Sequence, residues 1–314
     1  MQVQKIEVIA NETGGNHRTE KLLPGILAQL QATFGDYSLH KTEYHGHAEK
    51  LAAALCQENS DQPQTAWVLL VIGGDGTLHE VINGLQKNGG RKVAVGYIPT
   101  GTGDDFARAA GISEQPKKAI AQIAAASQPT ALDIGVITMR HGEKHYFVNN
   151  IGIGLDALIV HLTNHSSSKM VLNKFHLGNL SYPLNAISAY QIQEPYPIRI
   201  KNAQGAHYQF ERTFLMTVTN HPYFGGGIPI APPADLQDHS LYLVLVEKPK
   251  LRGLPSLVYK ILSSHSMDTP AIFHLKDTAF SLNVASKQHI QIDGEEGYSP
   301  IITRLSLSSQ PFLI

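Results

Sequence analysis

The first 130 residues alternate between two hydrophobic patterns, one typical of strands and one typical of helices. Runs rich in apolar and β-branched residues predict strands at 5–10, 37–44, 67–72 and 93–98. Apolar positions three and four residues apart predict helices between them, at 19–34, 46–58, 78–85 and about 105–110. This alternation indicates an α/β fold with a doubly wound, mostly parallel sheet.

After Pro129 the pattern changes, because strand-like runs follow one another with few helices between them. Strands are predicted at 131–140, 145–151, 196–200, 207–218, 241–246, 279–284, 288–292 and 301–307. Helical spacing is confined to 155–165, 180–193 and 252–265. We therefore expect an α/β domain over residues 1–129, followed by a mostly antiparallel β-sandwich domain over 130–301.

Composition excludes several classes of protein. The chain has 314 residues, of which 42% are hydrophobic, so it can bury a sizeable core. Its 25 Lys and Arg residues against 26 Asp and Glu give no basic excess, which argues against a nucleic-acid partner. The single cysteine, Cys56, permits no disulfide within the chain and is compatible with the cytoplasm.

Membrane contact is expected to be peripheral. The longest apolar run, 66–72, is far shorter than the roughly 20 residues of a membrane-spanning helix, and the start of the chain has no secretory pattern. Residues 166–180 mix lysines with apolar side chains and are a candidate membrane-facing flap, with helix 180–193 bordering an apolar groove.

The sequence Gly73-Gly74-Asp75-Gly76-Thr77 lies between a predicted buried strand and a helix. Glycines there let the backbone approach a ligand closely, and the N–H groups at the start of the helix favour phosphate. An ordinary turn with an aspartate cap is the simpler alternative, but two adjacent glycines exceed what a cap requires. The sequence matches neither the dinucleotide-binding fingerprint nor the P-loop.

Two more glycine-rich loops follow strands of the same predicted sheet, at 11–15 (NETGG) and 99–105 (PTGTGDD). The carboxyl ends of parallel strands meet at one edge of a sheet, where ligands bind. We therefore expect the three loops to surround a triphosphate.

The sequences GGDGTLHEVINGL and IPTGTGDDFARAAGI resemble the catalytic domain of the diacylglycerol kinase and sphingosine kinase superfamily, most closely its soluble bacterial lipid kinases. The resemblance continues through ALDIG at 131–135, the glycines 225–227, APPA at 231–234 and DGE at 293–295. It implies ATP and Mg²⁺ as cofactors, a lipid substrate at the membrane surface and a homodimer. It also implies that a tail of about residues 302–314 packs back on the first domain.

Carried over to this chain, the resemblance implies roles for individual residues. The ATP site would be lined by Asn11, Gly14, Gly15, Thr42, Gly73, Gly74, Asp75, Gly76, Thr77, Leu78, His79, Glu80, Thr102 and Asp105. Asp75 would organise the phosphates and a catalytic Mg²⁺, helped by Asp105 and Asp133. A structural Mg²⁺ would be held by Asp238 with main-chain oxygens of Asp235 and Ser240.

The acidic turn 293–296 has two interpretations. Asp-Gly is a strong hairpin signal, so a solvated turn explains it without chemistry. The resemblance instead makes Glu295 the general base on a lipid hydroxyl, with Asp293 beside it as a second catalytic carboxylate. An alcohol does not ionise near neutral pH, so a carboxylate within hydrogen-bond reach suits that task.

The chain also departs from the family pattern. Asp104 stands where asparagine is usual, and His239 replaces the glycine expected after Asp238, where a β-carbon could distort the loop. The leading hypothesis is an ATP-dependent lipid kinase that phosphorylates diacylglycerol. The alternatives are phosphorylation of a soluble acceptor, as in NAD kinases, and a nucleotide-binding regulator with impaired catalysis.

Overall fold

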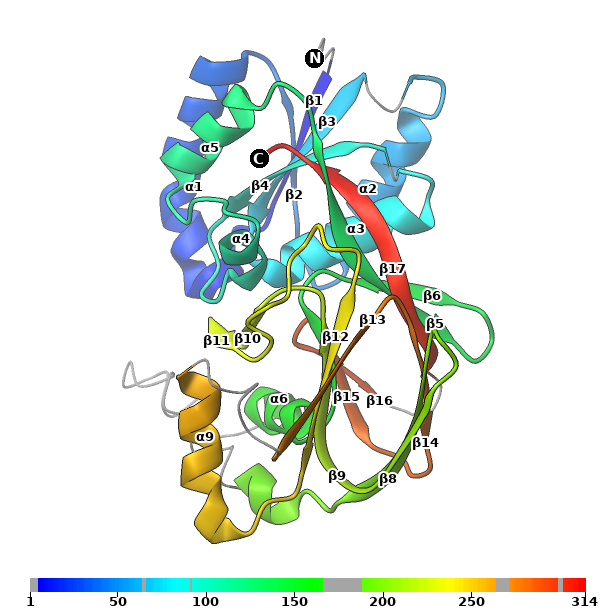
Figure 1. Cartoon of the computed structure of the whole chain (residues 1–314). Helices are drawn as coiled ribbons and strands as arrows, with labels where there is room; N and C mark the ends of the chain where they lie inside the picture. Colours follow the sequence, from blue (N-terminus) through cyan, green and yellow to red (C-terminus); the bar gives the residue numbers. More distant parts are fainter. Residues whose placement is uncertain (1–4, 64–65, 91, 166–187, 264–270, 299–301) are drawn as a thin grey trace.

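The computed structural model describes residues 5–63, 66–90, 92–165, 188–263, 271–298 and 302–314. The first half is a parallel sheet covered by helices on both faces (Figure 1). Its four strands are hydrogen-bonded in parallel in the order β2-β1-β3-β4. They span β1 (Lys5–Ala10), β2 (Ser38–Lys41), β3 (Trp67–Gly73) and β4 (Ala94–Pro99). The predicted α/β fold of this half is confirmed.

Side chains of the parallel strands alternate between two cores. Val8, Leu70 and Ile98 lie in a cluster with α1 (Gly14–Phe34) and α5 (Pro116–Ala125) on one face. On the other face, Leu69 and Tyr97 lie in a cluster with α2 (His47–Glu58) and α3 (Asp75–Lys87). Because both faces are covered, β3 is buried along its whole length, as its unbroken apolar sequence predicts. Helix α5 was not predicted.

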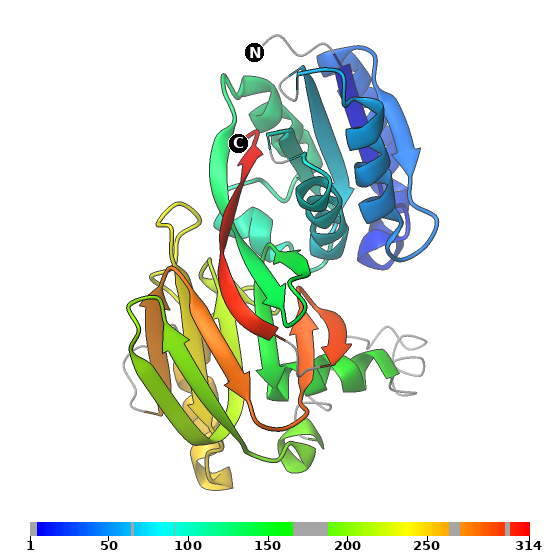
Figure 2. The same ribbon diagram turned by 90° about the vertical axis from the view of Figure 1, so that its right-hand side faces the viewer.

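The second half is a mostly antiparallel β-sandwich, as predicted, and its strands curve around a second core (Figure 2). The strands are β5 (Thr130–Met139), β6 (Lys144–Phe147), β7 (Asn150–Gly154), β8 (Tyr196–Asn202), β9 (His207–Thr219), β10 (Tyr223–Phe224), β11 (Ile228–Pro229), β12 (Leu241–Glu247), β13 (Ile272–Asp277), β14 (Phe280–Val284), β15 (His289–Ile292), β16 (Glu295–Tyr298) and β17 (Ile302–Phe312). The helices are α4 (Asp105–Ala109), between the halves, and α6 (Leu155–His165), η2 (Leu251–Gly253) and α9 (Leu254–Leu262) in the second half.

Three local predictions need correction. The strand predicted at 145–151 is two strands, β6 and β7, interrupted at Val148 and Asn149. Strands β13 and β16 were not predicted. Of the predicted helix 180–193, residues 188–192 are helical. The candidate flap 166–180 and residues 181–187 lie outside the described residues.

The last strand connects the two halves. Strand β17 pairs with β5 in antiparallel register over most of its length, and its end, Phe312, pairs in parallel with Val95 of β4. The N–H of Leu313 continues this pairing with a hydrogen bond of 2.9 Å to the carbonyl of Val95. Both halves therefore belong to one hydrogen-bonded sheet, and the carboxyl ends of β1, β3 and β4 face the second half (Figure 1).

Candidate active site

The three glycine-rich loops meet at the carboxyl ends of the parallel strands, and we call residues 11–15, 73–77 and 99–105 the glycine edge. The Asn11 side chain donates a hydrogen bond of 3.0 Å to Thr77 Oγ1, which joins the first loop to the second. Arg18 donates to the carbonyl of Gly101 at 2.9 Å, which joins helix α1 to the third loop. The expectation that the loops lie together is therefore met in the described structure.

Glycine is required at this edge because the loops approach one another closely. A β-carbon on Gly15, whose φ is +61°, would lie 2.3 Å from the carbonyl oxygen of Thr100. A β-carbon on Gly74 would lie 3.1 Å from the α-carbon of Gly101. A β-carbon on Gly76 would meet nothing within 4 Å, so the space above the first turn of α3 is open.

Asp75 lies in a group of buried carboxylates. Its two oxygens accept long hydrogen bonds from the N–H groups of Asp105 (3.1 Å) and Phe106 (3.3 Å) at the start of α4. Burial, together with the charges of Asp104 and Asp105, raises the pKa of Asp75 to about 7. Carboxylate oxygens are the donors that a hard divalent cation prefers, so Asp75 fits a catalytic Mg²⁺. The two oxygens of Asp105 are already engaged, one by Arg108 and one by the N–H of Gly226.

Other residues predicted at the ATP site have structural partners. Thr42 follows β2 and its N–H bonds to Ala10, so it lies at the same edge. Leu78 is fully buried in the core, so only its main chain faces the edge. The carboxylate of Glu80 accepts the N–H groups of Gly46 (2.8 Å) and Ala48 (3.0 Å), and thereby fixes the start of α2.

The hairpin between β15 and β16 approaches the glycine edge from the second half. Its two-residue turn is Asp293-Gly294, with φ of +50° and +85°, as in a type I′ turn. The Asp293 side chain is completely buried and accepts hydrogen bonds of 2.7–2.9 Å from the N–H groups of Val148, Asn149 and Asn150. This carboxylate is therefore an anchor for the hairpin, and its oxygens are engaged.

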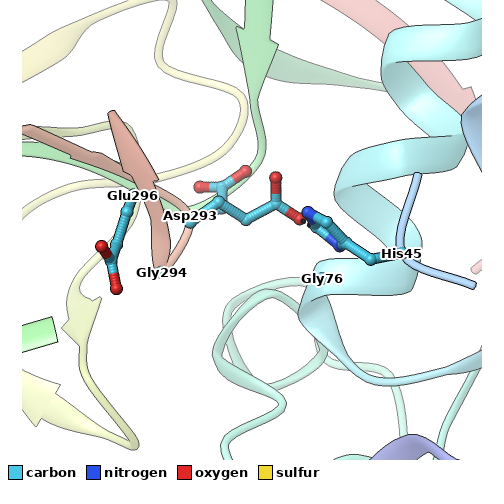
Figure 3. Close-up of a pocket in the computed structure, with 6 residues that line it drawn as sticks. His45, Gly76, Asp293, Gly294 and Glu296 are labelled. Atoms are coloured by element: carbon cyan, nitrogen blue, oxygen red, sulfur yellow. Dashed lines mark ion pairs between the residues drawn. The ribbon is translucent and has the colours of Figure 1, made fainter. Parts of the chain in front are cut away.

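Glu295 stands next to that anchor and lines an open cavity of about 480 Å³. The cavity is lined by His45, Gly76, Asp293, Gly294, Glu295 and Glu296, which are drawn as sticks in Figure 3. Burial, reinforced by the charges of Glu80 and Asp293, raises the pKa of Glu295 despite two nearby histidines. A raised pKa suits a general base.

Each of the two histidines lies near a different oxygen of Glu295. His45 Nδ1 lies 3.7 Å from Glu295 Oε1, and His79 Nε2 lies 3.9 Å from Oε2. His79 also shares a hydrogen bond of 2.8 Å with Asp293 through Nδ1. Burial disfavours the charged imidazole, but the bond to Asp293 and the surrounding acidic charges outweigh it and raise the pKa of His79. His79 thus links the anchor to the proposed base.

The loop 235–240 holds the other predicted metal ligands. The Asp133 carboxylate accepts the N–H of His239 at 2.8 Å and lies 3.0 Å from its Nδ1. The Asp235 side chain accepts the N–H of Gln237 at 2.8 Å. Because His239 has a φ of +54°, it occupies the backbone conformation that glycine usually provides.

Asp238 forms an ion pair with Lys276. Its Oδ1 accepts the N–H of Ser240 at 3.0 Å, and its Oδ2 accepts the hydroxyl of Tyr242 at 2.5 Å. Lys276 Nζ lies 3.0 Å from the same Oδ2. The carboxylate that would hold a structural Mg²⁺ is already paired with an ammonium group, so the residues of this loop do not fit a resident divalent ion.

The sequence did not single out several residues that the structure brings to the site. The N–H of Gly226 donates to Asp105 at 2.8 Å, and Arg108 pairs with the same carboxylate at 2.7 Å. His45 lines the same cavity as Glu295 and was not predicted at the site. The run of glycines at 225–227 was the available signal for the contact of Gly226 with Asp105, because all three adopt the positive φ that glycine favours.

A glycine-rich edge at the carboxyl ends of parallel strands, facing a carboxylate hairpin, is the arrangement expected of a phosphotransferase. The family model described as "Diacylglycerol kinase catalytic domain" matches residues 5–137, and the model described as "YegS C-terminal NAD kinase beta sandwich-like domain" matches residues 149–307. The chain belongs to the diacylglycerol kinase family that these two models describe.

Individual relatives agree with this assignment. The chain is 30% identical over 298 residues to a diacylglycerol kinase of Bacillus subtilis (strain 168), covering 94% of this chain and 91% of the relative. It is 27% identical to a diacylglycerol kinase of Staphylococcus saprophyticus, covering 94% and 90%. A crystal structure of a diacylglycerol kinase from Bacillus anthracis shares the fold, with a TM-score of 0.70 at 22% identity over 100% of this chain and 97% of that one.

Proposed function

We propose that this protein transfers the γ-phosphate of ATP to the hydroxyl group of a lipid, and that diacylglycerol is the acceptor. The observation that carries the proposal is the position of Glu295, which faces the cavity beside the open space above Gly76. The names of the relatives support the choice of acceptor. In this proposal residues 1–129 bind ATP and residues 130–301 bind the lipid, at the inner face of the cytoplasmic membrane.

The proposed reaction has one step. Glu295 accepts the proton of the lipid hydroxyl while the hydroxyl oxygen forms a bond to the γ-phosphorus. The bond between that phosphorus and the oxygen bridging to the β-phosphate breaks, and ADP leaves with the electron pair. Main-chain N–H groups of the glycine edge orient the phosphates, and Mg²⁺ held by Asp75 would neutralise their charge.

None of the helices in the described part of the chain is long and apolar enough to cross a membrane. In our proposal the lipid acceptor reaches the cavity from the surface of a bilayer or micelle.

The test is transfer of radiolabelled γ-phosphate from ATP, with Mg²⁺, to a panel of lipids in mixed micelles. Reactions with NAD and without lipid are the controls. Glu295→Gln is expected to lower the rate by roughly 100-fold or more, the usual effect of losing a general base. Glu143→Gln is the matched control, because Glu143 is an exposed hairpin carboxylate outside the cavity, and it should retain the wild-type rate.

Other outcomes would contradict the proposal. Label in NAD and in none of the lipids would indicate a soluble acceptor. Binding of ATP with no transfer to any acceptor would indicate a nucleotide-binding regulator. A Glu295→Gln variant as active as wild type would mean that another group accepts the proton.

A further inference from the structure

Exposed apolar side chains gather at one end of the second half. Among the described residues the large hydrophobic side chains that are exposed are Tyr44, Ile192, Leu251 and Tyr259. Leu251 and Tyr259 are 68% and 71% exposed and lie on η2 and α9, respectively. Ile192 is 59% exposed and lies in the neighbouring segment 188–193. Burying such side chains is favourable, so a concentration of them indicates a contact surface.

Two hydrogen bonds hold these segments against each other. The Tyr190 hydroxyl donates to the carbonyl of Pro249 at 2.8 Å, and Lys248 Nζ donates to the carbonyl of Gln193 at 2.8 Å. Lys248 also lies over the rings of Tyr190 and Phe214. Residues 188–193 and 248–260 therefore form one surface, which we call the α9 face (Figure 1).

The α9 face is basic, although the exposed carboxylates of Glu194 and Glu247 lie directly beside its two segments. Residues 248–260 contain Lys248, Lys250, Arg252 and Lys260 and no acidic residue, although the whole chain is nearly neutral. Lys250 and Arg252 are exposed next to Leu251. Apolar and aromatic side chains surrounded by lysine and arginine are typical of helices that lie in the headgroup region of an anionic bilayer.

The opposite side of α9 fixes this helix to the site. Leu257 is buried in a cluster with Phe224 of β10 and with Ile230, which directly follows β11. The turn of the β10–β11 hairpin includes Gly226, whose N–H bonds to Asp105 at the glycine edge. The β10–β11 hairpin thus contacts both α9 and the active site.

We propose that the α9 face docks the protein on an anionic lipid bilayer. The inference rests on the proposed function, because a kinase that takes its acceptor from a bilayer must bind that bilayer. Charge complementarity selects anionic lipid as the occupant: the exposed cations would contact phosphate groups while Leu251 and Tyr259 insert between the headgroups.

The test measures binding of the full chain to sedimenting vesicles without ATP and without diacylglycerol, so that turnover plays no part. Phosphatidylcholine vesicles containing phosphatidylglycerol should bind the wild-type protein, and pure phosphatidylcholine vesicles should bind it more weakly. Lys250→Glu combined with Arg252→Glu should lower the affinity for anionic vesicles by roughly ten-fold or more, and added salt should lower it as well.

A second variant, Leu251→Ala combined with Tyr259→Ala, should also lose binding while its circular dichroism spectrum stays that of wild type. Lys117→Glu combined with Lys118→Glu is the matched control, because these exposed lysines lie on α5 in the first half. It should bind as wild type does.

The inference is wrong if wild type does not bind anionic vesicles, or if the α9-face variants bind as tightly as wild type. It is also wrong if sedimentation without lipid shows a dimer that Leu251→Ala with Tyr259→Ala dissociates, since the face would then join two copies of the chain. Phosphate transfer in detergent micelles with no vesicle binding would overturn only the docking surface. Vesicle binding with no lipid phosphorylation would overturn only the proposed kinase activity.

Discussion

Replacement of Asp293 distinguishes an anchor from a catalytic acid or base. The buried carboxylate accepts three main-chain N–H groups at the break between β6 and β7, and it holds His79 at 2.8 Å. Asp293→Ala would leave the three N–H groups buried without an acceptor. Each such group costs about 1–3 kcal/mol, and alanine at positive φ adds about 1 kcal/mol.

The expected loss for Asp293→Ala is therefore about 4–6 kcal/mol in the free energy of unfolding, after allowing for water that enters the vacated space. At about 2 °C or more per kcal/mol, the unfolding temperature should fall by roughly 10 °C. Asp293→Asn keeps one acceptor oxygen and tolerates positive φ, so it should lose about half as much.

The assay is thermal unfolding followed by circular dichroism, together with phosphate transfer from ATP to lipid. Glu295→Gln is the control in the same hairpin: its side chain is partly exposed, so it should abolish transfer and leave the unfolding temperature within about 2 °C of wild type. An Asp293→Asn variant that unfolds like wild type but has no activity would refute the anchor and restore the catalytic role that the sequence suggests.

Three further predictions concern charge and space. Burial raises the pKa of Asp156 to about 6, so ionisation of this carboxyl lowers the stability of the fold as the pH rises from about 4 to 6. Asp156→Asn should therefore raise the free energy of unfolding, measured in urea, by up to about 3 kcal/mol at pH 8 and hardly at all at pH 4. Lys276→Met removes the ammonium partner of Asp238, so added MgCl₂ should raise the unfolding temperature of this variant by more than it raises that of the wild type. Gly76→Ala should fold normally but bind ATP roughly ten-fold more weakly by calorimetry, whereas Gly25→Ala, which also meets open space in a helix, should bind ATP as wild type does. A pH-independent effect at Asp156, a magnesium-insensitive Lys276 variant or full ATP affinity in Gly76→Ala would contradict the respective prediction.

Local patterns were sufficient for the α/β half. The strand at 67–73 has seven buried residues in a row, and only a sheet covered on both faces accommodates that pattern. Helix α5 was missed although Ala119, Ile120 and Ile123 have helical spacing and Pro116 lies at its first turn, where proline is favoured. That omission was avoidable, because the signal is local.

The break between β6 and β7 has a different origin. Residues 145–151 were predicted as one strand, although Asn149 and Asn150 are residues that strands disfavour. In the structure the N–H groups of Val148 and Asn149 bond to Asp293, a residue more than 140 positions away in the chain. A carboxylate that removes N–H groups from the ladder determines where the strand ends, and only the folded chain brings the two together.

The loop around His239 also depends on partners that are distant in sequence. His239 adopts positive φ and bonds to Asp133 through both its N–H and its ring. The cation beside Asp238 comes from β13, an unpredicted strand whose register places Lys276 opposite Tyr242. Sequence comparison draws attention to the missing glycine, whereas the compensating lysine is visible only through strand pairing. A substitution that departs from a family pattern should therefore be judged with its neighbours in space.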